Sequence, residues 1–328
     1  GQILQEGISE VGAFASWTAA ATSYSNHGVQ MIPFYIYYSM FGFQRIGDLA
    51  WAAADMQARG FLIGGTAGRT TLAGEGLQHQ DGHSHVAAST IPNCVAYDPA
   101  YAYELAVIIH DGLRRMHVEQ ENIFYYLTAM NENYLQPPMP DREGVREAIL
   151  RGMHRVQAAE SGAKFSVQLL GSGAILREVL GAAALLKSDF DISADVWSVT
   201  SFTELRREGL DTERWNRLHP EDEPRSNYVA ECLDRGRGPV IAATDYMKIH
   251  AEQIRPYVPT DYYALGTDGF GRSDSRCRLR YFFEVSRYFV TVSALSALAD
   301  RDAVPRSWVS DAMKKYGIDP EKPNPATT

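Results

Sequence analysis

An almost unbroken run of apolar and aromatic side chains occupies residues 31–38. A short, continuous run of this kind is typical of a central parallel strand that is covered on both faces. The run stops at Ser39, a plausible helix cap, and Phe41 lies in what reads as the start of a helix. Tyr38 and Phe41 are therefore expected at the carboxyl end of a strand, where open α/β sheets bind ligands. Two rings there could stack on a flat heterocycle, but this stretch alone favours two core residues.

Helical and strand patterns alternate along the rest of the chain. A polar, glycine-rich loop over 66–85 is unusual for a compact domain, and such loops are often functional. One helix is expected to begin at an Asp98 cap followed by Pro99. The proline-rich segment 136–140 suits neither a helix nor a central strand, so it marks a domain boundary. Helices are expected over 7–21, 44–59, 98–116, 174–186 and 290–298, and strands over 61–63, 93–97, 123–128, 165–170, 196–199 and 240–244.

The expected fold class is α/β, because alternating strands and helices form mainly parallel sheets covered by helices. A length of 328 residues suggests about two domains. We expect two consecutive α/β domains, over residues 1–136 and 137–328. The content of 45% hydrophobic and 22% charged residues allows each of them to bury a core.

Charge and cysteine content narrow the choice of partners and compartment. The 31 basic and 40 acidic residues give a net charge of −9, which argues against nucleic acid or an anionic membrane as the main partner. Cys94, Cys232 and Cys277 lie far apart and form no disulfide framework or CxxC pair, so a reducing compartment, the cytoplasm, is expected.

The ends of the chain also carry expectations. The first residues show no basic segment or cleavage-like site of a signal peptide, and no stretch reaches about 18 uninterrupted apolar residues. The chain begins without methionine, as if inside a domain, so we expect a fragment of a longer polypeptide. The tail 321–328 is expected to be a loose C-terminus.

Glu10 is a lone acid in the small, apolar helix predicted over 7–21. A buried carboxylate is usually paired or has a raised pKa. Two interpretations stay open: an exposed or capping glutamate at a frayed helix start, which is the commoner case, or an acid that shares a proton with a ligand nitrogen.

The loop over 74–85 concentrates three histidines and two acids. One interpretation is a metal site with His79, Asp81, His83 and His85 as ligands. The spacing is unlike the helical HExxH motif and no cysteine lies nearby, so a metal is disfavoured. We prefer a binding loop in which one histidine acts as acid, base or hydrogen-bond donor, with His83 and His85 bonded inside the loop.

Two glycine-rich segments are interpreted as structural. Residues 171–173 follow a strand and open a helix, but Leu176 replaces the third glycine of a dinucleotide-binding turn. Residues 266–274 lack the Lys-Ser/Thr of a phosphate-binding loop. Asp268 and Arg272 are expected to pair there, at a surface or a subunit contact.

Five segments together resemble the homodimeric bacterial pyruvate dehydrogenase E1 component, a thiamin diphosphate enzyme of the transketolase superfamily. Transketolase itself has a similar loop around Glu75 and His79 but lacks the DGHSH over 81–85. The resemblance covers the whole chain. The segments are ILQEGISEVGAFASW (3–17), MIPFYIYYSMFGFQRIGDL (31–49), GRTTLAGEGLQHQDGHSH (68–85), YDPAYAYELA (97–106) and LGTDGFGRSD (265–274).

The resemblance implies three α/β domains, of which this chain would be most of the second and all of the third. Residues 1–136 would be an N-terminally incomplete aminopyrimidine-binding domain, and 137–328 a transketolase C-terminal-like domain. The family binds diphosphate and Mg²⁺ in its first domain, whose Gly-Asp-Gly…Asn motif is not found here. No metal ligand is therefore assigned to this chain, and the chain alone is expected to be inactive.

The resemblance also assigns cofactor-binding residues. Glu10 matches the activating glutamate, which hydrogen-bonds the pyrimidine N1′ and favours the imino form that takes the thiazolium C2 proton; a proton shared with a ring nitrogen also suits an acid in an apolar helix. Tyr38 and Phe41 match the aromatic pair that packs on the pyrimidine. Ile8 matches the apolar residue that props the bent cofactor.

His79 matches a histidine facing the substrate, and Glu75 belongs to the same catalytic network. The implied reaction is decarboxylation of pyruvate and reductive acetylation of lipoyl groups on the E2 acetyltransferase, the link from glycolysis to the citrate cycle. The implied partners are a second subunit and E2, with no nucleic acid and no membrane. The alternatives are transketolase or another 2-oxo acid thiamin enzyme, a metal-dependent enzyme using 79–85, and a non-catalytic assembly module.

Overall fold

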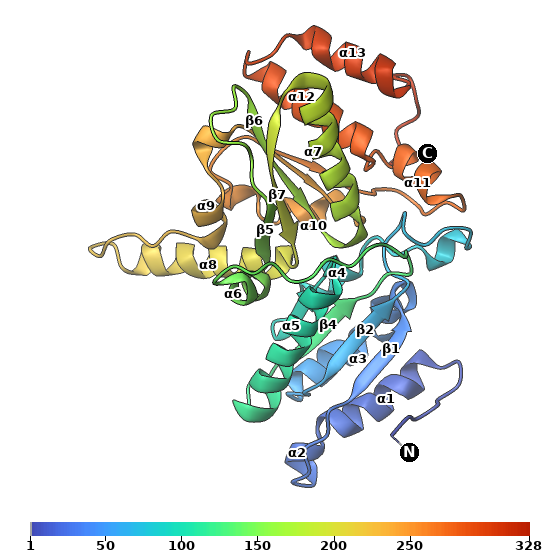
Figure 1. Ribbon diagram of the computed structural model, residues 1–328. Helices are drawn as coiled ribbons and strands as arrows, with labels where there is room; N and C mark the ends of the chain where they lie inside the picture. The colour runs from blue at the N-terminus through green and yellow to red at the C-terminus, as the bar shows by residue number, and fades with distance from the viewer. Residues whose placement is uncertain (1) are drawn as a thin grey trace.

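The computed structural model describes residues 2–328, which form two α/β units stacked end to end (Figure 1). The first unit is built on a four-stranded parallel sheet in the order β1-β2-β4-β3. Its strands are β1 (Phe34–Tyr38), β2 (Phe61–Gly65), β3 (Cys94–Tyr97) and β4 (Phe124–Thr128).

Side chains that alternate along these strands build a core on each face of the first sheet. On one face α1 and α3 supply residues such as Phe14 and Ile46, which pack with Tyr126 of β4. On the other face α5 and α6 pack against Tyr125 and Leu127 of the same strand. The helices are α1 (Glu10–Ala21), α2 (Ser23–Asn26), α3 (Gly42–Asp55), α4 (Ser84–Ala88), α5 (Ala102–Leu113) with the π-helix η3 (Arg114–Val118), and α6 (Val145–Arg151).

The second unit has a five-stranded sheet in the order β5-β7-β6-β8-β9, in which only β5 runs antiparallel. All seven residues of β7 are buried. The strands are β5 (Met153–Gln157), β6 (Ser166–Gly171), β7 (Ser193–Val199), β8 (Val240–Ala243) and β9 (Tyr262–Leu265).

One face of this sheet packs on α7, α12 and α13, and the other on α8, α9 and α10. Residues 171–173 make the turn from β6 into η4, as expected. The helices are α7 (Leu176–Phe190), α8 (Phe202–Leu218), α9 (Tyr228–Cys232), α10 (Lys248–Glu252), α11 (Arg276–Phe282), α12 (Arg287–Asp300) and α13 (Arg306–Tyr316), with short 3-10 turns η4 (Gly173–Ile175), η5 (Arg235–Arg237) and η6 (Arg255–Tyr257).

The prediction of two consecutive α/β units with mainly parallel sheets is confirmed. The boundary after residue 136 stays a prediction: α6 still packs in the first core, and β5 begins the second sheet at Met153. The helix expected over 290–298 is α12, and it is not the last helix, because α13 follows it.

The position predicted for the strand over 31–38 is wrong. Within residues 2–328, β1 pairs only with β2 and lies at the edge of the sheet. Phe34, Ile36 and Tyr38 are 45%, 71% and 49% exposed. An apolar run indicates that a surface is to be covered, but it does not say whether the same chain covers it.

The predicted start of α5 is also wrong. Glu104 Oε2 accepts hydrogen bonds from the N–H groups of Ala100 (2.6 Å) and Tyr101 (3.1 Å), so the helix is capped at Tyr101. Asp98 instead lies fully buried at the end of β3, where it accepts a hydrogen bond from Thr128 Oγ1 at 2.7 Å. Its burial raises the pKa of the carboxyl to about 7.

Residues Arg276–Asp300 are long and apolar enough to cross a membrane by length and composition alone. In the structure they form α11 and α12, and 56% of the apolar window is buried. Packing of α12 on the second sheet accounts for this composition.

Candidate active site

Tyr38, Phe41 and His79 form one aromatic cluster beyond the carboxyl end of β1. Tyr38 ends the strand, Phe41 ends the 3-10 turn η1 (Ser39–Phe41), and His79 ends the turn η2 (Leu77–His79). The ring centroids of Tyr38 and Phe41 are 6.1 Å apart, and the His79 ring lies 5.5 Å from the first and 5.0 Å from the second. The three rings, which come from two separate segments of the sequence, therefore lie together at the carboxyl edge of the parallel sheet.

Glu75 lies beside His79, as expected. Its Oε2 is 3.6 Å from His79 Nδ1, which is too long for a hydrogen bond. Among the described residues this buried nitrogen has no hydrogen-bond partner. An unpartnered ring nitrogen next to a carboxylate is suited to bind or move a proton of a ligand.

Glu10 joins the same cluster through Arg45 of α3. Arg45 Nη1 donates a hydrogen bond to Glu10 Oε1 at 2.6 Å, and the guanidinium lies 4.2 Å from the centre of the Phe41 ring. Ser9 caps α1 by accepting from the N–H of Gly12. Arg45 holds the pKa of the Glu10 carboxyl below its usual range. Glu10 is thus an ion-paired acid in the first turn of α1, and both interpretations of its role stay predictions.

Ile8 is fully exposed just before α1. It takes no part in the described aromatic cluster, and its role as a cofactor prop stays a prediction.

The metal interpretation of the 79–85 loop is wrong for the part of the chain that the structure describes, where no three potential ligands come together. Asp81 instead ties the loop to η1. Its Oδ1 accepts from the N–H groups of His83 (3.0 Å) and Ser84 (2.9 Å). Its Oδ2 accepts from the hydroxyls of Ser39 and Ser84. These bonds hold the loop against the turn that carries Phe41.

The N–H of His83 bonds to Asp81 inside the loop, as predicted, but the side chains of His83 and His85 bond to residues outside it. His83 Nε2 is 2.7 Å from Gln44 Nε2 of α3. His85 Nε2 is 2.9 Å from Thr128 Oγ1 of β4. The loop therefore packs across the first sheet, and burial lowers the pKa of His85 to about 3.

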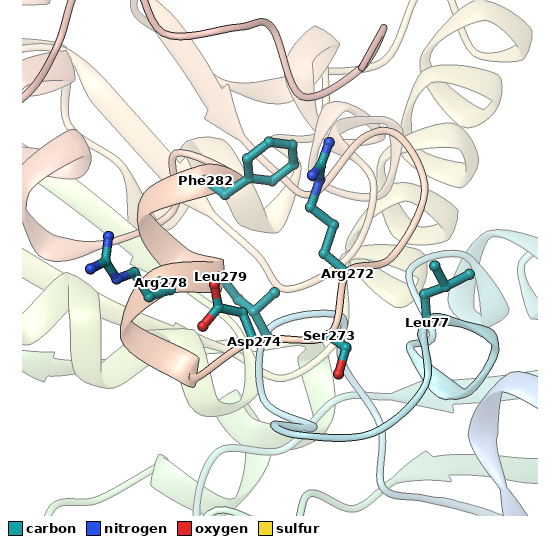
Figure 2. Close-up of a pocket in the computed structure, with 7 residues that line it drawn as sticks. All are labelled: Leu77, Arg272, Ser273, Asp274, Arg278, Leu279 and Phe282. Carbon is teal, nitrogen blue, oxygen red and sulfur yellow. The ribbon is translucent and has the colours of Figure 1, made fainter.

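A groove of about 360 Å³ opens between η2 and the C-terminal unit (Figure 2). Leu77 faces Arg272 and Ser273 across it, while Arg278 points away. Arg272 packs on the Phe282 ring at 4.1 Å. Over residues 2–328 it forms no ion pair with Asp268, which instead accepts a hydrogen bond from the N–H of Lys248, so the predicted pair is wrong.

The predicted site residues that come together are Glu10, Tyr38, Phe41, Glu75 and His79. Sequence reasoning missed Arg45 as the partner of Glu10 and treated Asp81 only as a possible ligand. The signal for Arg45 was its place four residues after Phe41, on the same face of a helix.

Two family models match the chain. The pyruvate dehydrogenase E1 component middle domain matches residues 1–137, and the transketolase-like C-terminal domain matches residues 152–286. Curated relatives named pyruvate dehydrogenase E1 component include those of Pseudomonas aeruginosa (66% identical over 326 residues) and Escherichia coli K12 (62% over 327 residues). Each alignment covers 99% of this chain, but only 37% and 36% of those relatives, so the chain spans a little over a third of their length.

Solved transketolases share the fold. The Campylobacter jejuni transketolase superposes with a TM-score of 0.63 at 18% identity, covering 85% of this chain and 38% of that one. A structure described as a split gene transketolase, inactive beta4 tetramer, has a TM-score of 0.61 at 16% identity and covers 89% of this chain and 83% of that one. The chain is therefore homologous to part of the pyruvate dehydrogenase E1 component, with residues 1–137 matching its middle domain and residues 152–286 a transketolase-like C-terminal domain.

Proposed function

We propose that this chain is the pyrimidine-binding and C-terminal part of a pyruvate dehydrogenase E1 component, which decarboxylates pyruvate and passes the acetyl group to lipoyl groups of the E2 acetyltransferase. One observation carries the proposal: Tyr38, Phe41 and His79 form a single cluster that Arg45 connects to Glu10. The relatives at 62–66% identity bear the E1 name.

The residues present fit a flat heterocycle with a basic nitrogen, the pyrimidine of thiamin diphosphate. When bound, this cofactor supplies the electron sink that lets carbon dioxide leave a 2-oxo acid. The half-exposed ring of Tyr38 and the ring of Phe41 offer a surface to stack on. Arg45 engages only Oε1 of Glu10, so in the described residues Oε2 is left to share a proton with a ring nitrogen.

The substrate side of the site is assigned to His79. Its ring, whose Nδ1 has no hydrogen-bond partner among the described residues, can donate an N–H to the carboxylate or carbonyl oxygen of pyruvate, with Glu75 beside it. Ile8 is assigned to the apolar support of the cofactor. The Mg²⁺ and diphosphate ligands are assigned to the part of the relatives that this chain does not span.

The proposed assembly is a homodimer in the cytoplasm that works with E2. Exposed apolar side chains support a further covering surface, because large patches of this kind usually mark contacts. They gather on β1 and on the segment before α1, and include Ile3, Leu4, Ile8, Ile36 and Tyr38.

Release of carbon dioxide from pyruvate tests the proposal. The complete polypeptide that contains this chain is assayed with thiamin diphosphate and Mg²⁺, and in parallel for ketol transfer between sugar phosphates. We expect release from pyruvate that depends on the cofactor, and no ketol transfer. Ketol transfer without release would make the protein a transketolase. No activity toward either substrate by a folded, cofactor-binding protein would favour the non-catalytic module.

A further inference from the structure

Hydrogen bonds to Asp245 connect the loop that carries Glu75 and His79 to the C-terminal unit. This residue follows β8, and its side chain is fully buried. Oδ1 accepts from Thr70 N (2.9 Å) and Thr70 Oγ1 (2.6 Å). Oδ2 accepts from Thr71 N (3.1 Å) and Thr71 Oγ1 (2.6 Å). One carboxylate thus receives four hydrogen bonds from two adjacent loop residues, which fixes the backbone there.

The loop approaches Asp245 so closely that only glycine fits at position 68. Gly68 has φ +88°, and a Cβ there would overlap the Asp245 carboxylate. The carbonyl of Asp245 also accepts from the N–H of Arg69 at 3.2 Å. The Arg69 guanidinium then extends the contact, donating to the carbonyls of Thr267 (2.5 Å) and Gly269.

A second set of contacts lies just after His79. The N–H of Arg272 donates to Gln80 Oε1 at 2.6 Å, and the N–H of Met247 donates to the carbonyl of Gly82 at 2.8 Å. Met247 is two residues after Asp245, so one segment of the C-terminal unit holds both ends of the loop.

Between these two sets, the C-terminal unit makes one further backbone contact, in which the N–H of Gly74 donates to the carbonyl of Asp274 at 3.2 Å. Leu77, in the same turn as His79, lines the open groove of Figure 2 and is 51% exposed. The placement of η2 therefore depends on the residues that hold the loop on either side of it.

We propose that Asp245 is a positioning residue for His79, acting through Thr70 and Thr71, so that the C-terminal unit sets the geometry of the catalytic loop. The proposal rests on the proposed function for its activity readout. It gives the C-terminal unit a role in the reaction without placing any of its side chains on the substrate.

The test compares Asp245→Asn with Asp195→Asn in the complete polypeptide. Asparagine would direct an NH₂ group at the N–H and O–H donors of one threonine and so disrupt its hydrogen bonds to residue 245. Asp195 is an equally buried carboxylate whose partners, Arg155, Ala159 and Arg237, all lie in the C-terminal unit. Thr71→Val is a milder variant that removes one O–H donor and keeps the side-chain shape.

Asp245→Asn should increase hydrogen exchange in residues 66–82 and lower kcat for pyruvate decarboxylation about 10²-fold, since a 1 Å misplacement has that scale of effect. Thr71→Val should act in the same direction, more weakly. Asp195→Asn should leave exchange over 66–82 unchanged. In a His79→Ala background, Asp245→Asn should change kcat less than about twofold, because its effect passes through His79.

Equal losses from Asp245→Asn with and without His79, or unchanged exchange over 66–82, would overturn the proposal. If His79→Ala alone keeps full activity, the proposed function of His79 fails and the positioning role fails with it. The exchange measurement then still reports whether Asp245 fastens the loop.

Discussion

The two sides of the candidate site are held in different ways. The His79 side is fixed by buried carboxylates: Asp81 accepts four hydrogen bonds from η1 and the loop, and Asp245 accepts four from Thr70 and Thr71. On the other side, the one side-chain partner of Glu10 within residues 2–328 is Arg45, and the exposed fractions of the Glu10 and Arg45 side chains are 20% and 48%.

This difference shows which half of the site is organised before a ligand binds. A buried carboxylate with every oxygen bonded fixes its donors tightly, because losing any bond leaves a charge unsatisfied. An exposed ion pair contributes little and exchanges partners easily. The loop half is thus preorganised within this chain, whereas the Glu10 half is left free to accept a ligand or another protein surface.

The substitution Asp81→Ala tests the firmly held His79 side of the site and should have the largest effect on stability. It leaves the hydroxyl of Ser39 and the N–H groups of His83 and Ser84 without their acceptor in a buried site. We expect a loss of at least about 3 kcal/mol in the free energy of unfolding, measured by urea titration. Asp48→Ala, at an exposed position on α3, should change it by less than about 0.5 kcal/mol. Similar losses of unfolding free energy in Asp81→Ala and Asp48→Ala would show that the hydrogen bonds of Asp81 do not stabilise the protein.

The pH dependence of stability is a second test of the buried side of the site, through His85. Burial lowers its pKa to about 3, and that of its stacked neighbour His250 is also lowered, so both rings stay neutral in the folded protein. The unfolded chain takes up protons below about pH 6.5. Stability from these rings is therefore present above that pH and is lost as pH falls toward 3.

The unsubstituted protein should lose unfolding free energy as the pH falls from 7.5 to 5, and His85→Gln should make this loss smaller by about 2 kcal/mol. This value assumes a contribution of about 1.4 kcal/mol for each pH unit below 6.5. Urea titrations at the two pH values measure it. The surface substitution His27→Gln serves as the control. An unaltered pH dependence in His85→Gln would contradict the neutral buried ring.

The smallest effect on stability is expected for Arg45→Gln. The pair with Glu10 is exposed, so the unfolding free energy should change by less than about 0.5 kcal/mol. The pKa of Glu10 should rise toward its ordinary value, since Arg45 is what lowers it. Carboxyl ¹³C NMR titration measures the shift. A large loss of stability would show that the Glu10 side is as firmly held as the loop.

The sequence pattern predicted the alternation of strands and helices, because such patterns are completed within the chain itself. Only the resemblance to a known family placed Tyr38, Phe41 and His79 in one site. The edge position of β1 could not be predicted, because an apolar run at 31–38 looks the same whatever covers it. Asp98 looked like a helix cap, but the Glu104 carboxylate three residues after Tyr101 caps the helix instead.

Long-range pairing was the other limit. Asp245 and Thr70 are 175 residues apart, and Arg45 lies 35 residues from Glu10. Each looks like an ordinary polar residue in its own segment. Only the packing of the two units shows that Asp245 is buried and Arg45 is not.

The most direct test of the central claim is Glu10→Gln in the complete polypeptide, with Arg45→Gln beside it. We expect Glu10→Gln to bind thiamin diphosphate but to lose at least about a hundredfold in pyruvate decarboxylation, because glutamine cannot hold the shared proton. Arg45→Gln, which leaves that carboxylate in place, should lose far less. Near-normal decarboxylation by Glu10→Gln would contradict the account and leave Glu10 as a structural partner of Arg45.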